Sequence, residues 1–154
     1  MAQLEFEDLN ALRALEGKSL PAGQWLNVTQ AMIDDFARAT SDYQWIHVDP
    51  EKAALHSPFK KTVAHGFLSL SLLSRMLGEL IRVRSATMGV NYGLNKVRFP
   101  SPVPVDSRIR LQGRILRMED YAATGVKITW DCTVEIEGGE KPACVAEFIS
   151  LMFE

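Results

Sequence analysis

One long helical stretch with almost no polar face constrains the fold of this chain more than any other feature. Between Gly66 and about Val83, apolar residues fill most positions of the helical repeat. These residues are Leu68, Leu70, Leu72, Leu73, Met76, Leu77, Leu80 and Ile81. The stretch is shorter than a membrane span, and Arg75 and Glu79 break it. A helix of this kind is buried nearly all round, so the rest of the chain must form a surface that wraps around it.

The second half of the chain has the pattern of such a surface. From Thr87 onward apolar and polar residues alternate, which is typical of half-buried strands, and Gly138-Gly139 indicates a hairpin turn. Within residues 89–153 we expect four strands, namely Gly89–Phe99, Arg108–Glu119, Gly125–Glu137 and Ala143–Phe153. The sequence therefore predicts an α+β fold in which an antiparallel sheet is wrapped around a long apolar central helix, residues 66–83.

The first 40 residues predict smaller elements that pack against this core. A short amphipathic helix is expected within residues 7–16, because leucines recur there at helical spacing and Gly17 follows. Gln24–Val28 has the composition of a brief strand. Thr29 is the expected N-cap of a helix that runs to about Thr40.

A long connection over residues 41–65 separates these elements from the central helix. Only one helical turn is expected within it, with Asp49 as its N-cap and Pro50 as its first residue. Connections of this length inside a compact domain usually carry function. We therefore expect residues 1–154 to form a single domain whose active-site loop is residues 41–65.

Composition excludes several classes of partner and site. The chain has 17 basic and 19 acidic residues, with no basic surplus for nucleic acid. Residues Met1–Asn10 carry three acidic side chains and lack the pattern of a secretory signal, so we expect a cytoplasmic protein with no membrane partner. Cys132 and Cys144 are too few and too far apart for a disulfide framework or a zinc site. We expect both to be reduced and half buried in strands, and we expect no metal.

The connection holds the residues that could carry chemistry. Asp42 precedes His47 by five positions, and His65-Gly66 opens the central helix. A carboxylate and an imidazole can together hold and deprotonate a water molecule. The free N–H groups at a helix start that begins with Gly66 suit an oxyanion on a carbonyl. Spacing alone still favours simpler roles: a turn residue for Asp42, a loop histidine bonded to backbone for His47, and a brace of the helix entry for His65.

Three segments together resemble a known family. They are Ala39-Thr40-Ser41-Asp42-Tyr43-Gln44-Trp45-Ile46-His47-Val48-Asp49-Pro50, Val63-Ala64-His65-Gly66-Phe67-Leu68 and Asn95-Lys96-Val97-Arg98-Phe99-Pro100-Ser101-Pro102-Val103. Their order and spacing are similar to those of the MaoC-like dehydratases, hot-dog-fold proteins that include the (R)-specific enoyl-CoA hydratases. Within that family the chain is most similar to the nodulation protein N-like branch, in which Gln-Trp commonly stands between the two catalytic positions.

The resemblance implies both a fold and an activity. It implies a hot-dog fold whose central helix is enclosed by the sheet, with two chains joining their sheets. It implies that Asp42 and His47 hold the water that adds across a trans-2-enoyl thioester, and that the Gly66 N–H polarises the thioester carbonyl. It also implies that Ser74 supports the carboxylate and the histidine, although a helix serine bonded to its own backbone is an equal alternative. No cofactor is implied, since coenzyme A is part of the substrate.

The chain departs from the hydratase pattern beside the catalytic pair. Ser41 stands where the family usually has glycine, and Gln44-Trp45 where it has Asn-Pro. These changes could reshape the acyl pocket, so Gln44 and Trp45 are candidate substrate-binding residues. Further apolar candidates for the acyl group are Ile46, Phe59 and Phe67; Lys60, Lys61, Lys96 and Arg98 are candidates for the phosphates of coenzyme A, and alternation does not decide whether Asn91 or Tyr92 faces the cleft.

The leading hypothesis is an (R)-specific enoyl-CoA hydratase or dehydratase that acts on an acyl-CoA or acyl-carrier thioester. Two alternatives remain open: a non-catalytic module that binds acyl thioesters, and a hot-dog acyl-CoA thioesterase. Homodimerisation is expected on physical grounds as well, because a small sheet around one helix leaves an edge that a second sheet can pair with.

Overall fold

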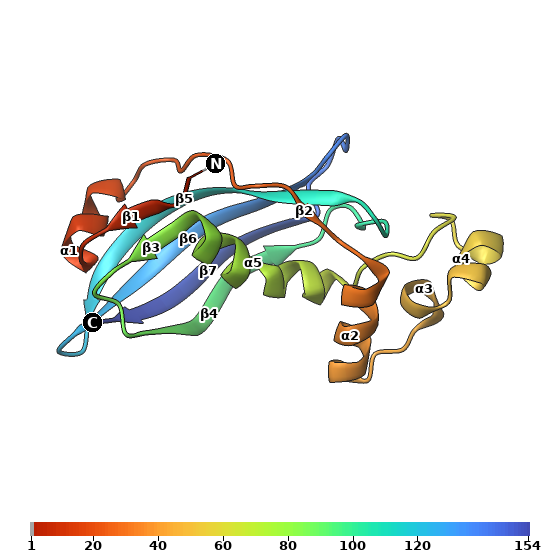
Figure 1. The fold of residues 1–154 in the computed structure, drawn as a ribbon, viewed down its shortest axis with the longest axis horizontal. Helices are drawn as coiled ribbons and strands as arrows, with labels where there is room; N and C mark the ends of the chain where they lie inside the picture. Colours follow the sequence, from red (N-terminus) through yellow and green to blue (C-terminus); the bar gives the residue numbers. More distant parts are fainter. Residues whose placement is uncertain (1) are drawn as a thin grey trace.

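A five-stranded antiparallel sheet lies along a central helix in the computed structural model, which describes residues 2–154. The strands follow the order β2 (Leu26–Asn27), β5 (Arg108–Tyr121), β6 (Gly125–Ile136), β7 (Cys144–Phe153) and β4 (Met88–Arg98). Helix α5 (Gly66–Leu80) runs along one face of this sheet (Figure 1). The α+β fold predicted from the sequence, an antiparallel sheet wrapped around a long apolar helix, is confirmed.

Helix α5 is buried on one side and not all round. Leu68, Leu72, Leu73, Met76, Leu77 and Leu80 belong to the core, together with β-strand residues such as Ile109, Ile128 and Val134. Phe67, Ser71, Ser74 and Gly78 are exposed and form a stripe along the helix. The expectation of burial all round was therefore wrong for the single chain. No helix within residues 2–154 has both the length and the apolar character needed to cross a bilayer.

The apolar stretch of the central helix contains two elements rather than one. Helix α5 ends at Leu80, and Ile81–Val83 forms strand β3, which pairs in parallel with β1 (Leu4–Phe6). The predicted end at residue 83 was wrong because an apolar run looks the same in a buried helix and a buried strand. Strand β1, which lies before the predicted helix 7–16, was not expected from the sequence.

The N-terminal helix is shorter than its prediction. Helix α1 (Leu9–Leu12) begins where the Asp8 side chain accepts a hydrogen bond from the N–H of Ala11, and a 3-10 turn (Arg13–Leu15) follows it. Leu9 and Leu12 are fully buried. The helix therefore packs against the core as the sequence predicts, over a smaller range than residues 7–16.

Three helices lie beyond one end of the sheet, beside the start of α5 (Figure 1). Helix α2 (Gln30–Thr40) is capped by Thr29, whose hydroxyl accepts a hydrogen bond from the N–H of Met32. Helix α4 (Pro50–His56) begins at Asp49 and Pro50 as predicted. Helix α3 (Trp45–Val48) was missed, because a four-residue helix with no side-chain cap leaves no sequence signal.

The two cysteines lie deeper than expected. Cys132 on β6 and Cys144 on β7 are fully buried rather than half buried. Burial raises the pKa of the Cys132 thiol to about 12 and that of the Cys144 thiol to about 11. Both are therefore unreactive thiols that pack in the core.

Candidate functional site

The side chains of Asp42, His47 and His65 lie together where helices α2, α3 and α4 lie beside the start of α5. One ligand atom of each side chain lies within 4.8 Å of those of the other two. Asp42 directly follows Ser41, which ends α2 in the left-handed conformation with φ of 60°. That backbone conformation is one that glycine adopts without strain, which gives a physical reason for the glycine that the family pattern has at this position.

His47 is held in one orientation by its backbone and by one ring nitrogen. The side chain is 7% exposed, and its Nδ1 lies 2.6 Å from the carbonyl oxygen of Val63. The backbone carbonyl of His47 accepts a hydrogen bond of 2.8 Å from the side-chain amide of Gln30. Because a carbonyl oxygen only accepts, Nδ1 carries the proton, and the neutral ring presents Nε2 as a proton acceptor.

The surroundings of His47 favour its neutral form. Burial lowers the pKa of His47 below its ordinary value of 6.5, and the neighbouring His65 lowers it further. The carbonyl of Val63 and the carboxylate of Asp42 act in the opposite direction but do not outweigh burial. His47 is thus kept as a neutral base near pH 7.

His65 bridges the two segments that carry Asp42 and His47. Its Nε2 lies 3.0 Å from the backbone carbonyl oxygen of Asp42. Its ring stacks on that of His47, with centroids 3.8 Å apart and planes tilted by 23°. Phe36 of α2 packs against it at 4.9 Å.

The same three side chains are of the types that bind metal ions. Metal ligands direct their lone pairs toward one point. The stacked rings of His47 and His65 lie in separate, nearly parallel planes, so lone pairs within these two planes are poorly placed to converge on one point. The separation of 4.8 Å or less instead suits a single water molecule that bridges Asp42 and His47.

Gly66 places an open backbone N–H beside this cluster. It is the first residue of α5 and directly follows His65. Within residues 2–154 the Gly66 N–H has no acceptor, as expected for the first turn of a helix. A Cβ added at Gly66 would lie 3.0 Å from the ring of Phe99, so the site has little room for a larger residue.

The other sequence-predicted residues lie around the cluster. Gln44 is exposed, and its backbone carbonyl accepts a hydrogen bond from the N–H of His47. Trp45 is half buried, with the Lys52 ammonium 4.8 Å from its ring. Phe67 is 67% exposed. Within the chain, Ser74 donates a hydrogen bond of 3.2 Å to Asn91 rather than to Asp42 or His47.

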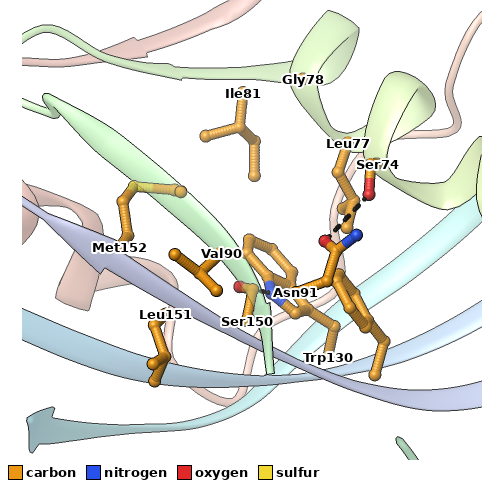
Figure 2. A pocket seen from close by; sticks show the side chains of 12 residues that line it. Ser74, Leu77, Gly78, Ile81, Val90, Asn91, Trp130, Ser150, Leu151 and Met152 are labelled. Carbon is orange, nitrogen blue, oxygen red and sulfur yellow. Dashed lines mark hydrogen bonds between the residues drawn. The ribbon is translucent and has the colours of Figure 1, made fainter. Parts of the chain in front are cut away.

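Two cavities, the α5–β4 cavities, lie between α5 and β4. The first, of about 210 Å³, lies against the C-terminal half of α5 (Figure 2). The second, of about 250 Å³, lies nearer Gly66 and includes Leu70 and Tyr92 in its wall. Ser74 and Asn91 border both, and Figure 2 shows the hydrogen bond between them at the edge of the first.

The walls of these cavities include residues that sequence reasoning did not assign to a site. Trp130 and Ser150 line the first cavity, and the Trp130 indole donates a hydrogen bond of 2.8 Å to the Ser150 hydroxyl. Phe148 lines both cavities. Strand alternation places all three on the face of the sheet that meets α5, but only the structure identifies which inward residues border open space. None of the four acyl-pocket candidates, Trp45, Ile46, Phe59 and Phe67, lines either cavity.

Comparisons with known proteins agree with the geometry. The family model described as MaoC like domain matches residues 13–135. The 3-hydroxyacyl-thioester dehydratase Z of Mycobacterium tuberculosis (strain ATCC 25618 / H37Rv) is 48% identical over 144 residues, which cover 94% of this chain and 95% of that protein. The nodulation protein N of Rhizobium leguminosarum bv. viciae is 46% identical over 137 residues, with 88% and 85% covered.

A solved structure shares the fold. The unliganded R-hydratase of Pseudomonas aeruginosa superposes with a TM-score of 0.69 at 22% identity, over 90% of this chain and 82% of that one. This similarity supports the predicted hot-dog fold. The family model spans most of the chain, including all three residues of the cluster. The chain therefore belongs to the MaoC-like family, as its sequence motifs predicted.

Proposed function

We propose that this chain is a hydro-lyase that reversibly adds water to trans-2-enoyl thioesters, as an (R)-specific enoyl-CoA hydratase or 3-hydroxyacyl-thioester dehydratase. The observation that carries the proposal is the meeting of Asp42 and His47 within 4.8 Å beside the N-terminus of α5. The relative named 3-hydroxyacyl-thioester dehydratase Z supports the same reaction class.

Each group of the cluster has a role in this reaction. Asp42 and His47 hold the water, and His47 Nε2 accepts a proton as the water oxygen bonds to the β-carbon of the substrate. The electron pair of the carbon–carbon double bond forms a new double bond between the α-carbon and the carbonyl carbon. The carbonyl electron pair moves to the thioester oxygen, where the Gly66 N–H stabilises the developing negative charge. The α-carbon then takes up the proton that Asp42 and His47 received from the water. Dehydration runs through the same steps in reverse, so no cofactor is required.

The assay for this function follows the enoyl-thioester absorbance. We expect it to fall when the purified protein meets crotonyl-CoA or a longer trans-2-enoyl-CoA, with no release of free thiol. Thiol release would indicate a thioesterase. Saturable binding of the thioester without loss of absorbance would indicate a binding module. Either result would contradict the proposed function.

The pH dependence of this activity follows from His47. Because its pKa lies below 6.5, its neutral form persists at pH values where an ordinary histidine is protonated. We expect the acid limb of kcat/KM to lie below pH 6.5. The unfolded chain takes up this proton near pH 6.5 and the folded chain resists it, so stability from this residue falls as the pH drops from 6.5 toward the folded pKa. An acid limb above pH 6.5 would contradict the role of His47 as a buried base.

We infer that the α5–β4 cavities receive the acyl chain. With about 1.5 Å of rise per helical residue, the second cavity begins about 6 Å from Gly66 at Leu70, and Ser74 lies about 12 Å from it. The walls are mostly apolar, which suits a hydrocarbon chain. In this arrangement the thioester lies at Gly66 and the chain extends along α5.

Gly78 offers a direct test of this placement. It lines the first cavity, and a Cβ added there meets no heavy atom within 4 Å. Gly78→Leu fills the cavity while removing a glycine that weakens the helix. We expect kcat/KM for a long enoyl-CoA relative to crotonyl-CoA to fall by at least about 10-fold. Arg75→Leu, on an exposed face of the same helix, is the matched control. An unchanged ratio in Gly78→Leu would exclude this cavity as the acyl site.

The phosphates of the carrier require a basic surface near the site. Lys60 and Lys61 are exposed on the connection that leads to His65, beside a shallow cavity that also includes Thr62. Lys96 and Arg98 are exposed near the end of β4. We propose that the first pair contacts the carrier phosphates, because it lies on the same loop as the catalytic cluster.

We also propose that the protein forms a homodimer through β4. This strand pairs only with β7 among the described residues, and most of it is exposed on both faces. Its exposed apolar residues include Met88, Val90, Tyr92 and Leu94. An unpaired apolar edge next to the exposed stripe of α5 suits pairing with a second copy.

The oligomeric state is measurable by light scattering. We expect a mass of twice 17.2 kDa for the native protein and partial or full dissociation of Tyr92→Asp, which places a charge on the exposed face of β4. Leu55→Asp is the matched control, because Leu55 is 73% exposed on α4. A monomeric native protein would overturn the proposed dimer.

A further inference from the structure

His65 contacts both catalytic residues and does more than support the start of α5. Its side chain is 3% exposed and lies between the two catalytic segments. It bonds to the backbone of Asp42, stacks on the ring of His47 and directly precedes Gly66. A single side chain thus contacts or adjoins every group that the proposed mechanism uses.

The protonation state of His65 follows from its partners. Nε2 lies 3.0 Å from a carbonyl oxygen, which only accepts, so Nε2 carries a proton. Nδ1 is buried and has no hydrogen-bond partner within residues 2–154. A second proton on Nδ1 would create a buried charged ring with an unpaired N–H, which is costly. The structure therefore favours the neutral Nε2–H form of His65.

His47 has the opposite neutral form. Its Nδ1 donates to Val63, which leaves Nε2 as the acceptor. The two stacked rings are thus held as different tautomers by two backbone carbonyls. Rotation or tautomer exchange of either ring would lose one of these two hydrogen bonds.

We propose that His65 is a positioning residue for the catalytic pair: its neutral Nε2–H form fixes the backbone of Asp42, and its ring face fixes the plane of His47. The proposal rests on the hydratase function and adds to it a residue that touches neither water nor substrate. Displacing a catalytic group by about 1 Å can lower a rate roughly 100-fold. A residue that sets the positions of both members of the pair therefore has a large effect on turnover.

The stacking of His65 on His47 also affects the protonation of His47. The titratable groups that face His47 are His65 and the carboxylate of Asp42; Phe36, which packs against His65 from α2, carries no charge. The stacked ring of His65, with its centroid 3.8 Å away, lowers the pKa of His47.

Variants at His65 separate positioning from simple packing. His65→Gln keeps an amide donor that can reach the Asp42 carbonyl, whereas His65→Leu keeps bulk and loses the donor. We expect kcat of His65→Leu to fall roughly 100-fold with KM little changed, and His65→Gln to recover much of that loss.

Tautomer states provide a readout that does not depend on activity. The chain has three histidines, and long-range proton–nitrogen NMR spectra of the native protein distinguish their forms. We expect His65 as the Nε2–H form and His47 as the Nδ1–H form, and the third histidine, His56, is exposed on α4. His56→Gln is the matched control for the kinetics.

Three outcomes would overturn the positioning role: a native-like kcat in His65→Leu, no recovery of kcat in His65→Gln, or a native His65 protonated at Nδ1. Failure of the proposed function is a separate result. It would appear as a native protein without hydratase activity, in which the NMR spectra still test the two tautomers.

Discussion

Asp42→Asn and His47→Gln are each expected to lower kcat for hydration of crotonyl-CoA by roughly 100- to 10,000-fold, the range typical of a lost general acid or base. The carboxylate and the Nε2 atom are the groups that hold and deprotonate the water in the proposed reaction. Asn keeps the shape of Asp42 but cannot accept a proton. The bond from His65 to the Asp42 backbone does not involve the substituted side chain, so it remains.

The controls distinguish lost chemistry from lost folding. His56→Gln removes an exposed histidine of α4 and is expected to retain native activity. We expect the circular dichroism spectra of both catalytic variants to match that of the native protein. Their thermal unfolding should differ from it only by the small effect of one substitution. Native-like turnover in a folded Asp42→Asn or His47→Gln variant would exclude the pair as the catalytic groups.

The fold could be predicted from the sequence where hydrophobic patterns were long. The apolar residues of α5 and the alternation in β5, β6 and β7 specify a helix against an antiparallel sheet, and the structure agrees. Three of the short elements were missed. β1, β3 and α3 are too short to show the hydrophobic period of a strand or helix. Their conformation depends on contacts with distant segments.

More of the cluster around Asp42 and His47 than of the α5–β4 cavities could be predicted from the sequence. The spacing of Asp42, His47 and Gly66 matches a family pattern, and the structure brings these segments together at the start of α5. The stacking of His65 on His47 had no sequence signal, because it depends on how two loops cross. The α5–β4 cavities involve Trp130 and Ser150, which lie far along the chain from the motifs. Their contribution depends on strand register, which alternation alone does not give.

Gly66→Pro is expected to lower kcat roughly 100- to 1,000-fold relative to Gly66→Ala, which is the cost typical of one lost oxyanion donor. Proline at the first helical position lacks the N–H but suits the helix, since its fixed φ is that of the first turn. His65 has φ of −59° and ψ of 137°, a conformation that the residue before proline readily adopts. The substitution therefore removes the N–H while keeping the start of α5.

Gly66→Ala is the matched control because both variants add the same Cβ. That atom would lie 3.0 Å from the Phe99 ring, so each variant must displace this half-exposed ring by a few tenths of an ångström. Any loss common to both variants therefore reports crowding by the Cβ, and the difference between them reports the lost N–H together with the two further ring carbons of proline. Steady-state kinetics with crotonyl-CoA and thermal unfolding of the two proteins measure these quantities. Equal kcat values in two equally stable variants would mean that the oxyanion is stabilised elsewhere, and the role of Gly66 in the proposed mechanism would be wrong.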